Sequence, residues 1–198
     1  MKNLIYFIVL VSFYSCGPKM YSYSFSMEGA KKDNHIHYDD DTISVVFNIF
    51  PKGFKMIYYN KTKSDIRVNW DEMKIQENGI EKEIIHVRRE KGRLISFQPP
   101  SSISPKERHE DFIVFEEGVT YSAGPEKSIL QIADIIPLKV NDSTKQIVQG
   151  LKGQRIAVHI PVEVSNITYS KSFTIVFGDI KIKRMVSGTD ILAGALSF

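Results

Sequence analysis

Histidine and aspartate side chains near the N-terminus are the first residues of this chain that could bind a metal. His35 and His37 lie two apart, and Asp39, Asp40 and Asp41 follow them. In an extended chain, residues two apart point to the same side, so the two imidazoles could bind the same metal ion. The aspartates alternate between the two sides, however, and the spacing matches neither a calcium loop nor a zinc signature. We therefore favour a solvated polar segment over a metal site.

Three further histidines are the candidates for acid–base or nucleophilic chemistry. His86, His109 and His159 stand in no catalytic motif, because the chain has neither a serine in a strand-to-helix elbow nor a helical His-Glu zinc motif. A hydrolase would need one of these histidines to meet a serine or a carboxylate in a cleft. We predict a protein that is not an enzyme and has no cofactor, and we keep a hydrolase as one alternative.

A single cysteine offers a different chemistry. Cys16 is the only cysteine, which excludes a disulfide within the chain. Lys2, an apolar run over residues 4–11 and Ser15 precede it, in the order of an export signal with a cationic start and a small residue before the cleavage point. A membrane-spanning helix needs roughly 20 apolar residues, and this run is much shorter. We predict cleavage between Ser15 and Cys16.

The residues before this cysteine resemble the lipobox of bacterial lipoproteins. In Phe13-Tyr14-Ser15-Cys16, phenylalanine stands where leucine is usual and tyrosine where a small residue is usual. Looser versions of this kind resemble those of Bacteroidota lipoproteins. The resemblance implies that the signal peptide 1–15 is removed and that Cys16 is acylated, for example with palmitate. The alternative is an incidental cysteine beside an ordinary cleavage site.

An acylated cysteine would place the protein at a membrane. Each buried acyl CH₂ contributes about 0.8 kcal/mol, so several chains give a lasting anchor where one does not. The residues after Cys16 are Gly17-Pro18-Lys19, without the acidic or glutamine-led signal that similar lipoproteins use to reach the cell surface. The resemblance therefore implies the periplasmic face of the outer membrane.

The overall charge excludes an obvious polyanionic partner. The chain has 26 basic and 23 acidic residues, and its net charge of +3 falls to +2 when Lys2 leaves with the signal. A nucleic-acid-binding domain is usually far more basic, so we predict no nucleic-acid partner. Removal of residues 1–15 leaves 183 residues, enough for one domain with a substantial core.

Alternating apolar and polar residues after residue 41 indicate the short antiparallel strands of a sandwich. The inward positions of the first three strands are Ile43, Val45, Phe47 and Ile49; Phe54, Met56 and Tyr58; and Ile66, Val68 and Trp70. A C-terminal hairpin has Ile156, Val158, Ile160, Val162 and Val164 facing Ile167, Tyr169, Phe173, Ile175 and Phe177, with a turn at Ser165-Asn166. Pro161 requires an edge or pairing on one side only. Gly178-Asp179 is a second turn or a bulge.

The middle of the chain gives a weaker pattern. Candidate strands are Ile84 to Arg88, Leu94 to Phe97 and Phe112 to Phe115, and Ser128 to Ile136 is either a helical turn or a strand. Pro99-Pro100-Ser101-Ser102 is typical of a segment that leaves one sheet and joins the other. No long helix with paired caps is evident. Residues 16–41 are predicted as a tether, with a strand over 21–27 as an equal alternative, and 185–198 as a tail.

One stretch supports a particular type of sandwich. Phe54 to Thr62, followed by Ile66 to Asp71, resembles a strand-turn-strand of immunoglobulin-like lipoproteins in the Bacteroidota, with Trp70 in the core. The resemblance covers about a sixth of the chain and carries no activity over. The predicted fold is thus an all-β, immunoglobulin-like antiparallel β-sandwich over residues 42–184.

Two short patterns suggest modification. Asp41-Thr42-Ile43 and Asp142-Ser143-Thr144 resemble the aspartate-led O-glycosylation motif of exported Bacteroidota proteins, which would modify Thr42 and Ser143.

For the folded body we favour a non-catalytic module that binds another envelope protein. The second hypothesis is a glycan or small-ligand binder with an exposed aromatic platform, which a buried Trp70 would weaken.

Overall fold

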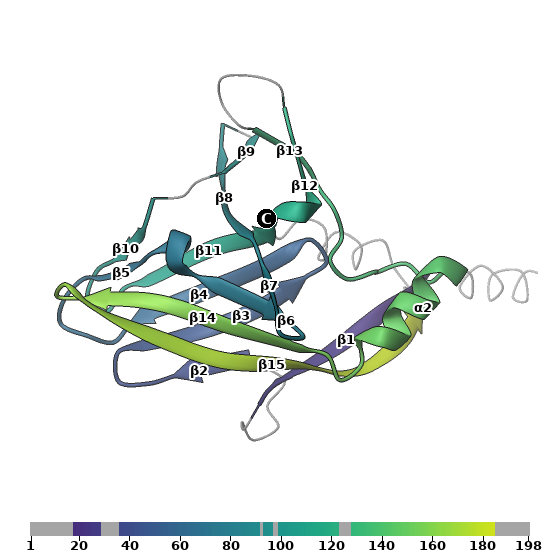
Figure 1. Cartoon of the computed structure of the whole chain (residues 1–198), viewed down its shortest axis with the longest axis horizontal. Coiled ribbons are helices and arrows are strands. Elements are labelled where there is room, and N and C mark those ends of the chain that lie inside the picture. Colours follow the sequence, from purple (N-terminus) through teal and green to yellow (C-terminus); the bar gives the residue numbers. More distant parts are fainter. Residues whose placement is uncertain (1–17, 29–35, 92, 97–98, 123–127, 185–198) are drawn as a thin grey trace, which may run out of the picture.

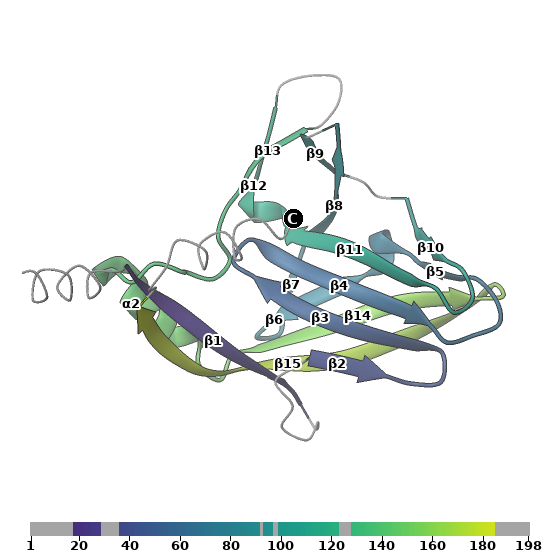
Figure 2. The same ribbon diagram turned by 180° about the vertical axis from the view of Figure 1, so that it is seen from behind.

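The computed structural model describes residues 18–28, 36–91, 93–96, 99–122 and 128–184. Over these residues the chain forms two antiparallel sheets packed face to face, with one short helix at one end (Figure 1, Figure 2). The all-β sandwich predicted from the alternation of apolar residues is confirmed.

The first sheet contains the C-terminal hairpin and the N-terminal strand. Its order is β1 (Lys19–Met27), β15 (Ile167–Arg184), β14 (Arg155–Val164), β5 (Ile66–Val68) and β10 (Ser101–Ile103), and β6 (Lys74–Glu77) and β7 (Ile80–Lys82) join it beside β14. The second sheet has the order β12 (Val119–Tyr121), β13 (Ser128–Ile132), β9 (Arg93–Ser96), β8 (Ile84–Glu90), β11 (Arg108–Phe115), β4 (Gly53–Asn60), β3 (Ile43–Phe50) and β2 (Ile36–Asp39).

The β14–β15 hairpin confirms the predicted turn and the predicted role of its proline. Ser165 and Asn166 adopt φ values of 50° and 63°, the left-handed geometry that a two-residue hairpin turn requires. Pro161 lies opposite Ser170 of β15, but on the other side of β14 it falls in the gap between the residues paired with β6 and those paired with β5. Pairing on one side only is therefore confirmed.

A bulge interrupts the pairing of β1 with β15. Ser24 of β1 faces both Gly178 and Asp179 of β15. A Cβ atom on Gly178 would lie 2.7 Å from the Ser24 Oγ and 3.3 Å from the Ser24 carbonyl oxygen, so a larger residue here would displace the Ser24 side chain. Of the two alternatives predicted for Gly178-Asp179, the bulge is confirmed.

The N-terminal boundary of the sandwich differs from the prediction. The strand alternative for residues 21–27 is confirmed, because β1 pairs with β15 from Lys19 to Met27 on both sides of the bulge. The sandwich consequently begins at Lys19 rather than at residue 42, and little of the predicted tether over 16–41 is left for a linker. The signal peptide 1–15, Cys16 and the tail 185–198 lie outside the described residues. No helix among the described residues is long and apolar enough to span a membrane.

The middle of the chain contains a helix that the sequence analysis did not predict. Helix α2 (Asp142–Leu151) begins with a capping box in which the Asn141 side chain accepts from the Thr144 backbone N–H and Thr144 Oγ1 accepts from the Asn141 N–H. Of the two alternatives for Ser128 to Ile136, the strand is confirmed over Ser128–Ile132, which is β13. The predicted crossing at Pro99-Pro100 is also confirmed, because β9 and β10 belong to different sheets.

The main core lies between the two sheets. It combines the inward positions of β3, β4 and β11 with those of β5, β14 and β15. Trp70 was predicted to belong to the strand of Ile66 and Val68, but it begins a 3-10 turn (Trp70–Glu72) instead. Its predicted place in the core is confirmed, because it is only 2% exposed. A second, smaller core lies on the opposite face of β11, where Val114 packs with Ile85 and Ile129. The sandwich thus covers both faces of β11, the strand that carries the candidate site.

Candidate functional site

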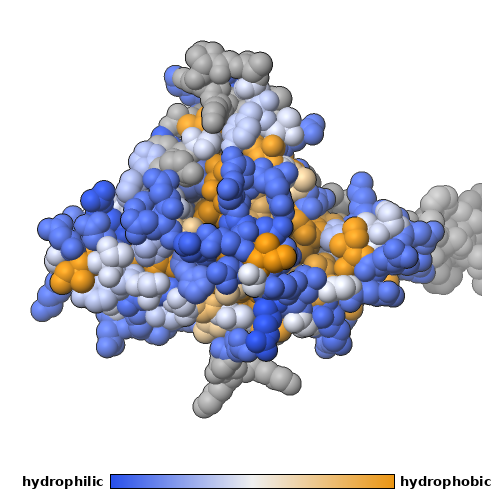
Figure 3. Space-filling view, in the orientation of Figure 1, coloured by the Kyte–Doolittle hydropathy of each residue, from blue (hydrophilic) through white to orange (hydrophobic). Residues whose placement is uncertain are grey.

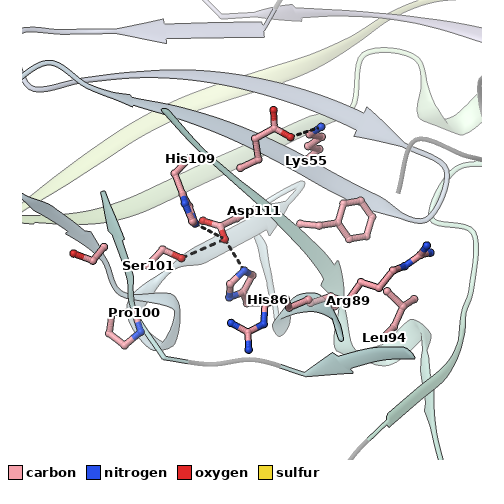
Figure 4. A pocket seen from close by; sticks show the side chains of 13 residues that line it. Lys55, His86, Arg89, Leu94, Pro100, Ser101, His109 and Asp111 are labelled. Atoms are coloured by element: carbon pink, nitrogen blue, oxygen red, sulfur yellow. Dashed lines mark hydrogen bonds and ion pairs between the residues drawn. The ribbon is translucent and has the colours of Figure 1, made fainter. Parts of the chain in front are cut away.

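A pocket of about 430 Å³ opens where β8 separates from β11 (Figure 4). Pairing between these strands ends at Val87 opposite Phe112, whereas β11 stays paired with β4 back to Arg108. The first half of β11 therefore has β4 on one side and the pocket on the other. Ser101 of β10 brings a residue of the first sheet to the same place.

Asp111 is the centre of the polar groups in this pocket. Its side chain is 4% exposed, and its Oδ1 lies 2.7 Å from His86 Nε2 and 3.3 Å from His109 Nε2. The Ser101 hydroxyl donates to the same oxygen at 3.2 Å. Among the described residues no group donates to the other oxygen, Oδ2, which is also buried. One carboxylate oxygen thus orients two imidazoles and one hydroxyl.

The indole of Trp70 holds two of these groups in place. Its Nε1–H donates to Ser101 Oγ at 3.1 Å, and its ring stacks on the His86 imidazole with centroids 4.2 Å apart. Because Ser101 accepts from Trp70 and donates to Asp111, its one proton is directed at the carboxylate. His86 and Ser101 are fixed on the inner side, whereas His109, whose side chain is 39% exposed, faces the opening.

The charges of the cluster stabilise each other. Burial alone would raise the pKa of Asp111, but the hydrogen bonds from His109 and His86 outweigh it and leave the pKa below its ordinary value. The hydrogen bond to Asp111 raises the pKa of His109 above its ordinary 6.5, although burial acts in the opposite direction. Burial, and secondarily the charge of Asp111, raises the pKa of Tyr58 well above its ordinary value. The pocket therefore contains an ionised carboxylate beside an imidazole that favours protonation.

These two shifts predict how stability depends on pH. The contribution of His109 is fully present below about pH 6.5 and is lost as pH rises through its raised pKa. The contribution of Asp111 is present above about pH 4 and is lost as pH falls through its lowered pKa. We expect the domain to be most stable between these limits in urea titrations at several pH values.

In Asp111→Asn, NMR titration should show the pKa of His109 returning toward 6.5; an unchanged His109 pKa would contradict the assigned partner.

Cationic side chains dominate the rim of the pocket. Lys55 Nζ contacts Glu110 at 2.6 Å, and Arg88 and Arg89 extend from β8. Apart from the histidines, the charged lining residues are Lys55, Arg88 and Arg89 against Glu110 and Asp111, a net charge of +1, and the raised pKa of His109 favours a further positive charge. Apolar side chains, among them Leu94 and Pro100, complete the wall (Figure 4).

This arrangement favours anion binding over covalent catalysis. A protonated imidazole backed by a buried carboxylate is a strong donor to an anionic oxygen, and it can also act as a general acid. A nucleophilic serine would need to give its proton to an imidazole, and here the Ser101 proton points to Asp111. Among the described residues no group of three or more ligands has the geometry of a metal site.

Comparisons with known proteins give no family for this chain. No family model and no curated protein matches it. Among solved structures, one match is described as "Crystal structure of protein from Archaeoglobus fulgidus"; it is 12% identical, and the match covers 84% of this chain and 97% of that chain with a TM-score of 0.27. A similarity at this level supports no conclusion about fold or function, so the site rests on its own geometry.

The other candidate residues lie away from this pocket. His37 is 2.7 Å from Ser44 and is exposed, and its predicted companion His35 lies outside the described residues. His159 is 2.8 Å from Ser172 on the exposed face of β14. Ser143 is exposed in the first turn of α2, and its hydroxyl donates to Asn141. Glycosylation at Ser143 and at the half-buried Thr42 stays a prediction.

The structure brings together residues that the sequence listed separately. His86 and His109 were candidates, and both contact the same carboxylate. The sequence analysis missed Asp111 and Ser101. One signal was present: His109 and Asp111 lie two apart before the apolar run Phe112 to Phe115, which is the spacing of one strand face.

Proposed function

We propose that the protein is a lipid-anchored outer-membrane protein whose sandwich domain binds a small anionic molecule in the pocket at Asp111. The observation that carries this proposal is His109, which lies 3.3 Å from the buried Asp111 carboxylate at the mouth of a pocket with net positive charge, and whose pKa this contact raises. Pockets of 300–1,000 Å³ are typical of sites for small molecules, and this pocket lies within that range.

The proposed ligand has an acidic group and an apolar part. The acidic group would accept from His109 and from the arginines of β8, and the apolar part would contact Leu94, Phe112 and Pro100. The aromatic platform of a glycan binder gains no support from Trp70, because its ring is buried. A small anionic ligand is therefore the form of the ligand-binding hypothesis that the geometry favours.

Titration with matched small probes tests the proposal. We expect benzoate and phenyl phosphate to shift the NMR signals of His109 and Leu94, whereas benzamide, which has the same ring and no charge, should not. His109→Gln should weaken binding of the anions by roughly tenfold, as expected for a lost charge-assisted hydrogen bond. Binding should also weaken as pH rises through the raised pKa of His109.

A variant outside the pocket controls for a general loss of positive charge. Arg67 of β5 is exposed, lies 3.8 Å from Glu163 and does not line the pocket, so Arg67→Gln removes one cation that the proposed ligand would not contact. We expect Arg67→Gln to bind both anions like the unmodified protein. Equal binding of benzoate and benzamide, or equal weakening by both substitutions, would contradict an anion site at His109.

The lipid anchor in this proposal is supported by Phe13-Tyr14-Ser15-Cys16, which resembles a lipobox and follows a short apolar run. Detergent phase partition of native protein measures it directly, because acyl chains move a water-soluble domain into the detergent phase. Recovery in the aqueous phase, or a Cys16→Ser variant that fractionates like the native protein, would contradict lipid anchoring.

Partner binding, the non-catalytic role predicted from the sequence, is the second candidate. The observation in its favour is the end of the β14–β15 hairpin, where Ile167 and Tyr169 are 57% and 43% exposed. Figure 3 shows apolar surface at this end of the molecule. Pull-down from envelope extracts, with Ile167→Ser as the comparison, tests it; equal recovery of partners with both proteins would contradict a role for this hairpin.

A further inference from the structure

The start of β1 fixes which end of the domain lies near the proposed lipid anchor. Strand β1 begins at Lys19, three residues after Cys16. Consecutive Cα atoms are 3.8 Å apart, so Lys19 cannot lie more than about 11 Å from the Cα atom of the acylated cysteine. Lys19 is paired with Arg184 at the end of β15, and its carbonyl accepts from the backbone of Val140, just before α2. This part of the domain must therefore stay close to the membrane.

We call this region the anchor-proximal end and define it as residues 19–23, 138–152 and 179–184. Its basic residues are Lys19, Lys139, Lys145, Lys152, Lys181, Lys183 and Arg184, and all seven are exposed. Its acidic residues are Asp142 and Asp179, which form ion pairs with Lys145 and Lys152. The region has a net charge of +5, whereas the whole chain has +3, so the rest of the chain sums to −2. The positive charge is concentrated beside the anchor.

Apolar side chains lie among these basic residues. Ile147 of α2 and Ile182 of β15 are each 55% exposed. The combination of exposed lysines and large apolar side chains is typical of surfaces that bind the head-group region of a membrane. Figure 1 and Figure 2 show α2 and the end of β15 together at one end of the sandwich, opposite the β14–β15 turn.

We propose that the anchor-proximal end binds the anionic head groups of the membrane that holds the lipid anchor. This inference rests on the lipid anchoring proposed above. A bound end would fix the orientation of the domain, so that the β14–β15 turn points away from the bilayer. Electrostatic attraction of this kind acts within about a Debye length, roughly 8–10 Å at physiological salt. The Cα atom of Lys19 lies at most about 11 Å from that of Cys16, so the two distances are similar.

Site-specific quenching in liposomes tests the proposal on the lipidated protein. An acylated Cys16 leaves no thiol, so a single introduced cysteine accepts one fluorophore. Ile147→Cys labels the anchor-proximal end, and Ile167→Cys is a matched control at the opposite end, because the two isoleucines are 55% and 57% exposed. In phosphatidylglycerol liposomes with a head-group quencher, we expect at least roughly threefold stronger quenching at position 147.

The electrostatic part of the proposal has its own controls. The difference between the two positions should shrink severalfold in phosphatidylcholine liposomes and in about 1 M salt, where the Debye length is only about 3 Å. Lys181→Gln with Lys183→Gln should reduce it, whereas Lys63→Gln with Lys74→Gln, which removes two lysines elsewhere, should not. The salt experiment needs no substitution of a basic residue, so it holds even if the lysine variants fold poorly.

The outcomes separate this inference from the proposed anchor. Protein that remains in the aqueous phase of a detergent partition would overturn both. Protein that partitions with the detergent, yet shows equal quenching at positions 147 and 167, would overturn only the binding of the anchor-proximal end. A difference that is insensitive to salt and to lipid charge would also overturn it, because the tether alone would then explain the proximity.

Discussion

Asp111→Ala is expected to lower the free energy of unfolding by about 3 kcal/mol, because it leaves His86 buried without its carboxylate. The His86 side chain is 4% exposed, and Asp111 Oδ1 is 2.7 Å from its Nε2. The Ser101 hydroxyl would lose its acceptor in the same step. Urea denaturation at about pH 6 measures the loss under conditions in which the cluster is most stable.

Glu110→Ala is the matched control for this substitution. Glu110 is the adjacent carboxylate and forms an ion pair with Lys55, but its side chain is 42% exposed. Exposed ion pairs contribute less than about 1 kcal/mol, so the control should have a small effect. Asp111→Asn keeps an acceptor oxygen and should fall between the two. Similar losses for Asp111→Ala and Glu110→Ala would show that the buried cluster contributes little to stability.

Gly53→Ala is expected to destabilise the domain by about 3 kcal/mol, at the upper end of the usual cost of overpacking. A Cβ atom on Gly53 would lie 2.4 Å from the Ile113 carbonyl oxygen and 2.9 Å from the Phe112 ring. The oxygen belongs to the backbone of β11, so the strand must shift to relieve the contact. Because β11 carries His109 and Asp111, we also expect altered NMR signals at the pocket.

Gly150→Ala provides the opposite expectation from the same chemical change. Beyond its own helix, no atom of the described residues lies within 4 Å of the added Cβ, and in a helix such as α2 alanine is favoured over glycine by about 1 kcal/mol. We expect thermal unfolding to shift upward for Gly150→Ala and strongly downward for Gly53→Ala. A neutral result for Gly53→Ala would mean that β4 and β11 are less tightly packed than the structure indicates.

The strands were predictable where one face is buried and the other is solvated. The β14–β15 hairpin follows from alternation and from a turn sequence that tolerates positive φ, both of which are local properties. Strand β1 was left open because serines fill its alternate positions, as they do in many linkers. Helix α2 was missed because its cap is an Asn-Thr pair rather than the usual pair with glutamate.

The candidate site was only partly predictable, for a topological reason. The histidines could be listed as reactive side chains, but their shared partner depends on pairing between strands that are distant in sequence. His86 reaches Asp111 because β8 pairs with β11, and Ser101 reaches it because the chain crosses to the other sheet at Pro99-Pro100. No spacing in the sequence encodes these two contacts. The pocket also needs β8 to separate from β11, which alternation does not reveal.

The bulge at Gly178-Asp179 sets the phase of the last part of β15. Before it, odd-numbered residues such as Ile175 and Phe177 face the core; after it, the even-numbered Ile180 packs against the core and Lys181 and Lys183 are exposed. Strand β1 keeps one parity throughout, so the extra residue restores agreement between the two strands. If the same residues paired regularly without the bulge, the parities after it would be exchanged and both lysines would face inward, so the bulge keeps their positive charge on the surface of the anchor-proximal end.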